Sequence, residues 1–354
     1  MANQIDQYLR QLIGNDGSDL HLIAGQPPRM RVYGDITPIE NEILTADGAR
    51  DMFLEIMDEK ARYEFDKHDS ADFAYHIEGL ARFRVNVMRH LGGMGAVLRA
   101  IPSTARTLVE LNMPPAVTRL SKEPQGLILV TGKTGSGKST TLAAMIDAIN
   151  DRLHGHIVTI EDPIEFVHER KKCLITQREI GQHTNSFGDA LHSALREDPD
   201  VILVGEMRDL ETISIAVTAA EMGILVMGTL HTNGAAQTVD RIVNVFPTDK
   251  QSHVRTMLST SLRGVVSQQL VPKKDGNGLV AALEILVNNS ATANLIRQGK
   301  LDQLETAMQS GRRAGMCTMD GTLKDLMDKA LISGKSAYEF ANEKSKFEAV
   351  KMQG

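Results

Sequence analysis

The segment 126–141 constrains the fold more than any other part of the sequence. A short apolar run at 127–130 leads into GKTGSGKS at 132–139, and apolar residues then recur at helical spacing from Leu142 to Leu153. The middle part fits the pattern G-x-x-x-x-G-K-[ST] at every fixed position. A buried strand, a glycine-rich loop and a helix in this order are the context of a phosphate-binding P-loop. The sequence therefore predicts an α/β domain that binds a nucleotide.

The residues of this loop suit a polyphosphate chain for physical reasons. Glycines lack Cβ atoms, so successive backbone N–H groups can turn towards an anion, and the start of a helix adds partial positive charge. Lys138 can reach the β- and γ-phosphates, and the Ser139 hydroxyl can bind Mg²⁺. We therefore expect ATP and Mg²⁺ as ligands. The expected nucleotide-binding residues are Gly132, Lys133, Thr134, Gly135, Ser136, Gly137, Lys138, Ser139 and Thr140.

Three further apolar runs, at 157–160, 201–204 and 224–229, alternate with helical stretches. This alternation is typical of a doubly wound parallel sheet, in which ligands bind beyond the carboxyl ends of the strands. The residues that directly follow each run are therefore candidates for the site. They are the acidic segment 161–165, Glu206 and His231.

Each of these candidates has a functional and a structural interpretation. Glu206 follows four apolar residues, as does the carboxylate beside Mg²⁺ in P-loop enzymes, but a surface acid can also end a strand. The carboxylates of 161–165 can hold Mg²⁺ or orient an attacking water, or they form an acidic turn at Pro163. His231 can hydrogen-bond to a γ-phosphate, or it is a structural histidine. The position beside the predicted P-loop favours the functional interpretation for the carboxylates.

The sequence pattern divides the chain into four parts. Residues 1–101 combine helical patterns with antiparallel strands, which predicts a small α+β domain. Residues 102–115 contain three prolines and are expected to form an interdomain linker. Residues 116–290 hold the predicted parallel sheet. Residues 291–354 are mostly helical, with loose order expected at 339–354, where no strong pattern follows Ala341.

The N-terminal part contains a long helical pattern and three arginines on predicted strands. A continuous helix is expected at 45–65. Between 81 and 87, apolar residues alternate with Arg82 and Arg84, and Arg99 lies on the next strand. The arginines either form a solvated sheet face or act in trans on the nucleotide of a neighbouring subunit. Nothing in the local sequence decides between these two interpretations.

Composition limits the classes of function. The net charge of −6 and the aromatic content of 4% argue against a large nucleic-acid surface, which needs clustered cations and stacking aromatics. No apolar run reaches the roughly 18 residues of a membrane span, and no signal peptide is recognisable. We therefore expect a soluble cytoplasmic protein. Its two distant cysteines, Cys173 and Cys317, are expected to be reduced thiols.

Four motifs together carry a resemblance to a known family. The segments GKTGSGKST, EDPIEFVHE, REDPDVILVGEMRD and GTLHTN follow one another along the chain. With them, the sequence resembles the type II/IV secretion ATPases, and among these the branch that retracts type IV pili. Three features depart from the family pattern: Lys133 where proline is common, Ile224 where histidine is common, and an altered helix at 291–298.

The resemblance implies a PAS-like N-terminal domain joined to a RecA-like P-loop ATPase domain with a helical C-terminal segment. It further implies a homohexamer that acts at the inner-membrane face through a pilus platform protein. From the composition, no nucleic acid is expected as a partner. Glu165 would be the acid nearest the attacking water. The residues implied as catalytic are Glu165, Glu206, His231, Arg82, Arg84 and Arg99. Those implied as Mg²⁺ ligands are Ser139, Glu206 and Glu161.

Three alternatives stay open at this point. Pilus extension and type II secretion ATPases share these motifs, but they commonly carry a long N-terminal extension and a four-cysteine zinc site, neither of which is expected here. RecA-like folds also drive nucleic-acid motors, which the acidic balance disfavours. A non-catalytic regulator with the same fold is disfavoured by the intact Lys138, Glu165 and Glu206. The sequence therefore favours a pilus-retraction ATPase.

Overall fold

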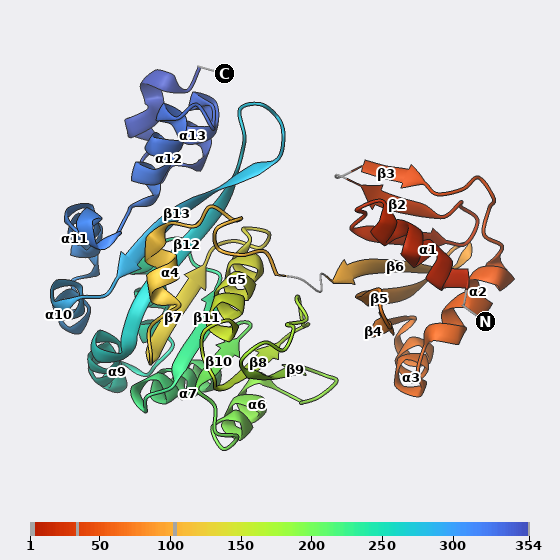
Figure 1. Ribbon diagram of the computed structural model, residues 1–354, viewed down its shortest axis with the longest axis horizontal. Helices are drawn as coiled ribbons and strands as arrows, with labels where there is room; N and C mark the ends of the chain where they lie inside the picture. Colours follow the sequence, from red (N-terminus) through yellow and green to blue (C-terminus); the bar gives the residue numbers. More distant parts are fainter. Residues whose placement is uncertain (1–3, 33–34, 102–104, 353–354) are drawn as a thin grey trace. The chain divides into compact units, whose positions relative to one another are not determined.

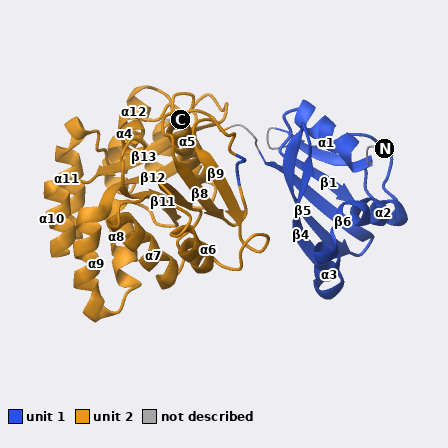
Figure 2. Ribbon diagram, turned by 60° about the horizontal axis from the view of Figure 1, so that its bottom comes forward, with its two compact units in different colours: residues 1–104, 165–167 blue, residues 105–164, 168–354 orange. Residues whose placement is uncertain are grey.

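The protein divides into two compact units. The computed structural model describes residues 4–32, 35–101 and 105–352. Unit 1 consists of residues 1–104 with Glu165–Val167, and unit 2 of Ala105–Ile164 with His168–Gly354 (Figure 2). The division falls inside the segment 102–115 that the sequence predicts as a linker, of which 102–104 lie outside the described residues. Residues 165–167 group with unit 1, although the sequence-based boundaries assign them to the domain at 116–290.

Unit 1 is built on a six-stranded antiparallel sheet with the order β3-β2-β1-β6-β5-β4 (Figure 1). Its strands are β1 (Asp19–Ile23), β2 (Arg29–Val32), β3 (Asp35–Pro38), β4 (Ser70–Ile77), β5 (Ala81–His90) and β6 (Gly93–Ile101). Its helices are α1 (Gln4–Gly14), α2 (Ala46–Ile56) and α3 (Glu59–His68). Helices and sheet share one apolar core, which includes Leu9, Phe53 and Phe83. The opposite side of β5 carries Arg82 and Arg84, as the alternation predicts.

The prediction of a single helix at 45–65 is wrong, because two helices, α2 and α3, occupy this stretch. Thr45 caps α2 by accepting a hydrogen bond from the Gly48 N–H group. Met57 then adopts an extended backbone, with φ −80° and ψ 126°. Asp58 starts α3 by accepting a hydrogen bond from the Ala61 N–H group at 2.7 Å. An aspartate with helix-capping geometry therefore divides a pattern that looks continuous in periodicity alone.

Unit 2 is built on a seven-stranded sheet with the order β13-β12-β7-β11-β10-β8-β9 (Figure 1). Its strands are β7 (Gly126–Thr131), β8 (His156–Glu161), β9 (Leu174–Glu179), β10 (Val201–Val204), β11 (Leu225–Leu230), β12 (Leu262–Pro272) and β13 (Leu279–Val287). All neighbours pair in parallel except β12 and β13, which are antiparallel. The predicted α/β fold is confirmed, and the four predicted strands are present. The pattern did not predict β9, β12 or β13.

Helices cover both faces of this sheet. They are α4 (Pro115–Leu120), α5 (Lys138–Asn150), α6 (Phe187–Ala194), α7 (Leu210–Glu221), α8 (Ala235–Asn244) and α9 (Thr248–Ser261). The residues of α4 and α5 join one apolar core, and those of α6 to α9 join another, on the other side of the sheet. This double layer buries the parallel strands on both faces, so their carboxyl ends are where side chains can meet a ligand.

The C-terminal part of unit 2 consists of short helices. They are α10 (Ser290–Gln298), α11 (Leu304–Ser310), α12 (Met319–Asp328), α13 (Gly334–Phe340) and the 3₁₀ helices Leu301–Gln303, Arg312–Ala314 and Lys344–Val350. The expectation of loose order at 339–354 is wrong for the described part of this segment, residues 339–352. Phe347 is only 3% exposed and packs with Leu323 and Ile332 in a small separate core. Isolated apolar residues such as Phe347 give no periodic signal, so the sequence pattern missed this anchor. Among the described residues, no helix is both long and apolar enough to span a membrane.

Candidate functional site

The glycine-rich loop lies between β7 and α5, where the sequence predicts it. Gly132, Gly135 and Gly137 have φ angles of 141°, 78° and 86°, a region that favours glycine. A Cβ atom on Gly132 would lie 2.3 Å from the carbonyl oxygen of Gln268, so this position has no room for a side chain either. The shape of the loop therefore depends on these glycines.

Lys138, the first residue of α5, is enclosed by this loop. Its Nζ donates hydrogen bonds to the carbonyl oxygens of Gly132 at 2.9 Å and Lys133 at 3.0 Å. The residue is only 8% exposed, and burial lowers the pKa of its ammonium group, while the negative charge of Glu206 acts in the opposite direction. A buried cation held only by carbonyl dipoles gains strongly from a nearby anion. Lys138 is thus prepared for a phosphate group.

Two buried hydroxyl groups show that the loop fits such a ligand. Thr131 Oγ1, at the end of β7, and Ser136 Oγ, in the loop, have no hydrogen-bond partner among the described residues. Buried hydroxyl groups are usually paired, and phosphate oxygens accept hydrogen bonds from them. The start of α5 is also suited to an anion, because its N-cap is Gly137, which has no side chain to cap the helix. These residues therefore fit a bound polyphosphate.

Glu206 and His231 lie together at the same edge of the sheet. They follow β10 and β11, which are parallel neighbours with Val204 opposite Gly228. Glu206 Oε1 lies 3.3 Å from His231 Nε2, and Glu206 Oε2 accepts a hydrogen bond from Arg208 at 2.7 Å. The Arg208 guanidinium lowers the pKa of the Glu206 carboxyl, and His231 adds to this effect. Glu206 is therefore a fixed, ionised carboxylate close to Lys138.

Glu161 is held inside the protein at the end of β8. It is 8% exposed, and its Oε1 accepts hydrogen bonds from Thr159 Oγ1 at 2.7 Å and Gln177 Nε2 at 3.4 Å. Its neighbour in register on β9 is Glu179, which accepts a hydrogen bond from the Ile164 N–H group at 3.2 Å. These contacts fix the start of the acidic segment. Glu161 therefore has a structural role alongside its predicted role as a Mg²⁺ ligand.

The other predicted catalytic residues belong to unit 1. Glu165 is exposed and groups with that unit. Arg84 and Arg99 are direct cross-strand neighbours on β5 and β6. Arg99 Nε lies 2.8 Å from the buried Asp19. Unit 2 thus brings together Lys138, Glu206 and His231, whereas Glu165 and the arginines lie in unit 1.

The sequence pattern did not identify Gln268 as part of the site. This residue lies on β12, beside β7, and is only 2% exposed. Its Oε1 accepts a hydrogen bond from Thr141 Oγ1 at 2.8 Å, and its Nε2 would lie 2.7 Å from a Cβ atom on Gly137. Gln268 therefore supports both ends of the phosphate-binding loop. The available signal was a polar group, Ser267 to Gln269, inside the apolar stretch 265–271.

Comparison with known proteins agrees with this geometry. The sequence profile of the family described as "Type II/IV secretion system protein" matches residues 1–345. The chain is 54% identical over 324 residues to the type IV pilus retraction ATPase PilT of Pseudomonas aeruginosa, which covers 92% of this chain and 94% of the relative. It is 52% identical over 315 residues to a twitching motility protein of Neisseria gonorrhoeae, covering 89% of this chain and 84% of the relative.

A solved structure is similar over nearly the whole length. The crystal structure of the pilus retraction motor PilT with bound ADP matches with a TM-score of 0.91 and 45% identity, covering 97% of this chain and 98% of the other. Family profile, relatives and structure all extend over both units. The chain belongs to the type II/IV secretion system protein family.

Proposed function

We propose that this protein is an ATPase motor that powers the retraction of type IV pili. The observation that carries the proposal is the buried Lys138 inside its glycine loop, with the ionised Glu206 beside it, in a chain 54% identical to a pilus retraction ATPase. Twitching motility, which the name of a second relative mentions, is the expected output in cells. The reaction is hydrolysis of ATP to ADP and phosphate.

In the proposed mechanism, the loop residues bind the phosphates of ATP. Lys138 exchanges its two carbonyl partners for phosphate oxygens, and the unpaired hydroxyl of Ser136 donates to the same chain. Ser139, Glu206 and Glu161 would supply the hydroxyl and carboxylate oxygens that Mg²⁺ prefers. When bound, Mg²⁺ neutralises charge on the phosphates. Since Glu206 is held by Arg208 and His231, its carboxylate is positioned before ATP arrives.

The remaining catalytic groups act when subunits assemble. Glu165 orients the attacking water, and His231 hydrogen-bonds to the γ-phosphate. Arg82, Arg84 and Arg99 are the candidates for a guanidinium that stabilises the transition state in trans. Hydrolysis would then depend on assembly, because these groups come from outside the phosphate-binding loop.

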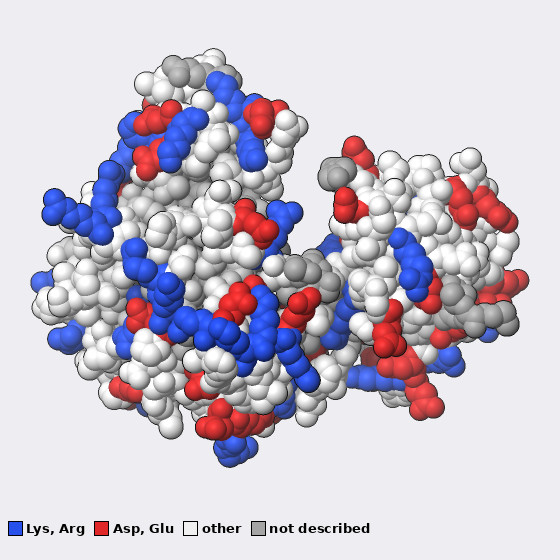
Figure 3. Space-filling model, in the orientation of Figure 1, with Lys and Arg blue, Asp and Glu red and all other residues white. Residues whose placement is uncertain are grey.

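We place this motor in a homohexamer at the inner-membrane face, where a pilus platform protein receives the movement. A nucleic-acid motor is disfavoured because acidic residues outnumber basic ones, 45 to 39, and acidic side chains lie beside the basic ones on the face shown in Figure 3. We therefore expect that DNA does not stimulate ATP hydrolysis.

The test is the number of surface pili on cells whose only copy carries Glu206→Gln. The matched control is Glu221→Gln, which makes the same chemical change at an exposed position at the end of α7. A retraction motor predicts more surface pili and lost twitching for the first variant and normal behaviour for the control. Few or no pili would instead indicate an extension motor, and an unchanged number would exclude a sole retraction motor.

A further inference from the structure

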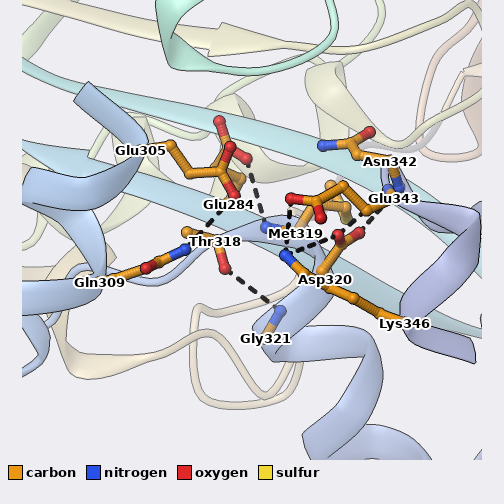
Figure 4. Close-up of polar contacts among 10 residues, drawn as sticks. All are labelled: Glu284, Glu305, Gln309, Thr318, Met319, Asp320, Gly321, Asn342, Glu343 and Lys346. Carbon is orange, nitrogen blue, oxygen red and sulfur yellow. Dashed lines mark hydrogen bonds and ion pairs between the residues drawn. The ribbon is translucent and has the colours of Figure 1, made fainter. Parts of the chain in front are cut away.

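Glu284 is a buried carboxylate at a junction between two helices. It lies on β13 and is 5% exposed. Its Oε1 accepts a hydrogen bond from the Ala235 N–H group at 2.8 Å, and its Oε2 accepts one from the Met319 N–H group at 3.2 Å. Ala235 and Met319 are the first residues of α8 and α12, and Figure 4 shows the contact with Met319. One side chain thus caps two helices that lie far apart in the sequence.

The first helix, α8, is directly connected to the candidate site. Only residues 232–234 separate His231 from α8. The N-cap, Gly234, has φ 95°, and a Cβ atom there would lie 3.0 Å from Glu284 Oε1. The Gly234 N–H group donates to Ser267 Oγ at 2.8 Å. Because Gly234 has no capping side chain, β12 and β13 hold this end of the His231 loop (residues 231–234).

The second helix, α12, is the attachment point of the C-terminal block, which we define as residues 317–350. Thr322 Oγ1 donates to the carbonyl oxygen of Leu283 at 2.6 Å, next to Glu284. The Asp320 carboxylate accepts hydrogen bonds from the N–H groups of Asn342 at 2.8 Å and Glu343 at 3.1 Å (Figure 4). The first turn of α12 is therefore bound both to β13 and to the last part of the chain.

These contacts form an unbroken chain from the candidate site to the C-terminal block. We propose that Glu284 is a positioning residue that fixes the His231 loop beside Glu206, and that the C-terminal block influences ATP hydrolysis through it. The inference rests on the proposed ATPase function. A carboxylate is required because each oxygen accepts one N–H group, whereas a glutamine would point its own NH₂ group at one of them.

The surroundings of Glu284 make this carboxylate costly to keep. Burial raises its pKa, the two backbone N–H groups lower it, and the nearby Glu305 and Asp320 raise it further. A buried carboxylate next to other acids destabilises a fold unless its hydrogen bonds are needed. An apolar residue at this position would pack β13 without capping either helix. We therefore infer that a carboxylate is present at this position because it caps α8 and α12.

The test compares Glu284→Gln with Thr322→Val in the purified full-length protein. Both substitutions weaken the contact of α12 with β13, but only the first also releases α8. We expect Glu284→Gln to lower kcat for ATP about ten-fold with KM changed by less than about two-fold, because the loop around Lys138 is untouched. Thr322→Val leaves both hydrogen bonds of Glu284 in place, so the proposed coupling stays intact and kcat should remain within about two-fold of the wild type. Hydrogen exchange of the 232–238 backbone should accelerate only in Glu284→Gln.

Two results would overturn the inference. One is a folded Glu284→Gln protein with wild-type kcat. The other is an equal loss of kcat in Thr322→Val, because hydrolysis would then depend only on the contact between α12 and β13 and not on the cap that Glu284 provides to α8. If Glu284→Gln does not fold, the wild type decides: ADP should slow hydrogen exchange in both 232–238 and 317–323. Slowing in the first segment alone contradicts the coupling. The proposed function is judged separately, by pilus number in the Glu206→Gln strain.

Discussion

The phosphate-binding loop of unit 2 and the arginine face of unit 1 (Arg82, Arg84 and Arg99) both carry positive charge, but the surroundings of that charge are opposite. Lys138 is 8% exposed and bound to the carbonyl groups of its own loop. The side chains of Arg84 and Arg99 are 47% and 65% exposed and pair with Asp72 and Asp19. The lysine is desolvated and has no bonded carboxylate among the described residues, whereas the arginines are hydrated and already neutralised.

This difference teaches how each site can meet an anion. The loop is complete within one contiguous segment, so a single chain can bind a phosphate. An exposed arginine paired with an acid gains little from an ion in solution, because water and the acid already stabilise it. It becomes catalytic only when another surface excludes water around it. The loop should therefore function in any single chain, and the arginine face only in an assembly.

The largest effect is expected from Lys138→Ala, because Lys138 is the buried cation of the loop, whereas the other lysine there, Lys133, is exposed. We expect ATP affinity to fall at least about 100-fold and hydrolysis to fall to background. Nucleotide titration and phosphate release measure both quantities. Lys133→Ala, which removes an exposed lysine of the same loop, should weaken binding by less than about ten-fold. Equal losses in both variants would remove the distinction between buried and exposed charge.

The next largest effect concerns the arginine face. If one of its residues acts in trans, Arg84→Ala or Arg99→Ala should lower kcat by about 10³-fold with little change in ATP affinity. Mixing such subunits with Lys138→Ala subunits should restore part of the activity, since some interfaces then combine an intact loop with an intact arginine. The control is Arg89→Ala, on the same strand and paired with Asp69. If kcat is normal in each single variant and mixing restores no activity, the arginines form a solvated sheet face and do not act in trans.

Contiguous features of the molecule could be predicted from the sequence, and assembled ones could not. The loop at 132–139 and the strand at 201–204 are as predicted, because neighbouring residues determine both. Gln268 and Glu284 were missed, since each acts through a partner more than a hundred residues away or on another element. The periodicity of a sequence does not predict such contacts between distant residues. The local signal for them is a polar residue inside an otherwise apolar strand.

A smaller effect is expected from removing the support of the loop by Gln268→Ala. This change leaves the buried Thr141 hydroxyl unpaired and opens space beside Gly137. We expect a loss of about 1–3 kcal/mol in the free energy of unfolding and a KM for ATP raised several-fold, by about three to ten times. Gln269→Ala, at the neighbouring half-buried position, should change neither quantity appreciably. Chemical unfolding and steady-state kinetics provide the measurements, and equal effects of the two variants would contradict a specific role for Gln268.

The smallest effect concerns His168, a histidine outside the phosphate-binding loop, and tests whether its burial alone changes the pH dependence of stability. Burial lowers the pKa of His168 to about 4, with Asp147 acting in the opposite direction. The unfolded chain takes up this proton near pH 6.5, so between that value and 4 it binds more protons than the folded state, and stability falls as pH falls. His168→Asn should remove about 2 kcal/mol of the stability that the wild type loses between pH 7 and pH 5, measured by urea unfolding. The exposed His154→Asn should retain it. Identical pH dependence in both variants would show that the imidazole of His168 is hydrated in the folded protein. Its burial would then have no effect on stability, in contrast to the expected effect of the buried Lys138 on phosphate binding.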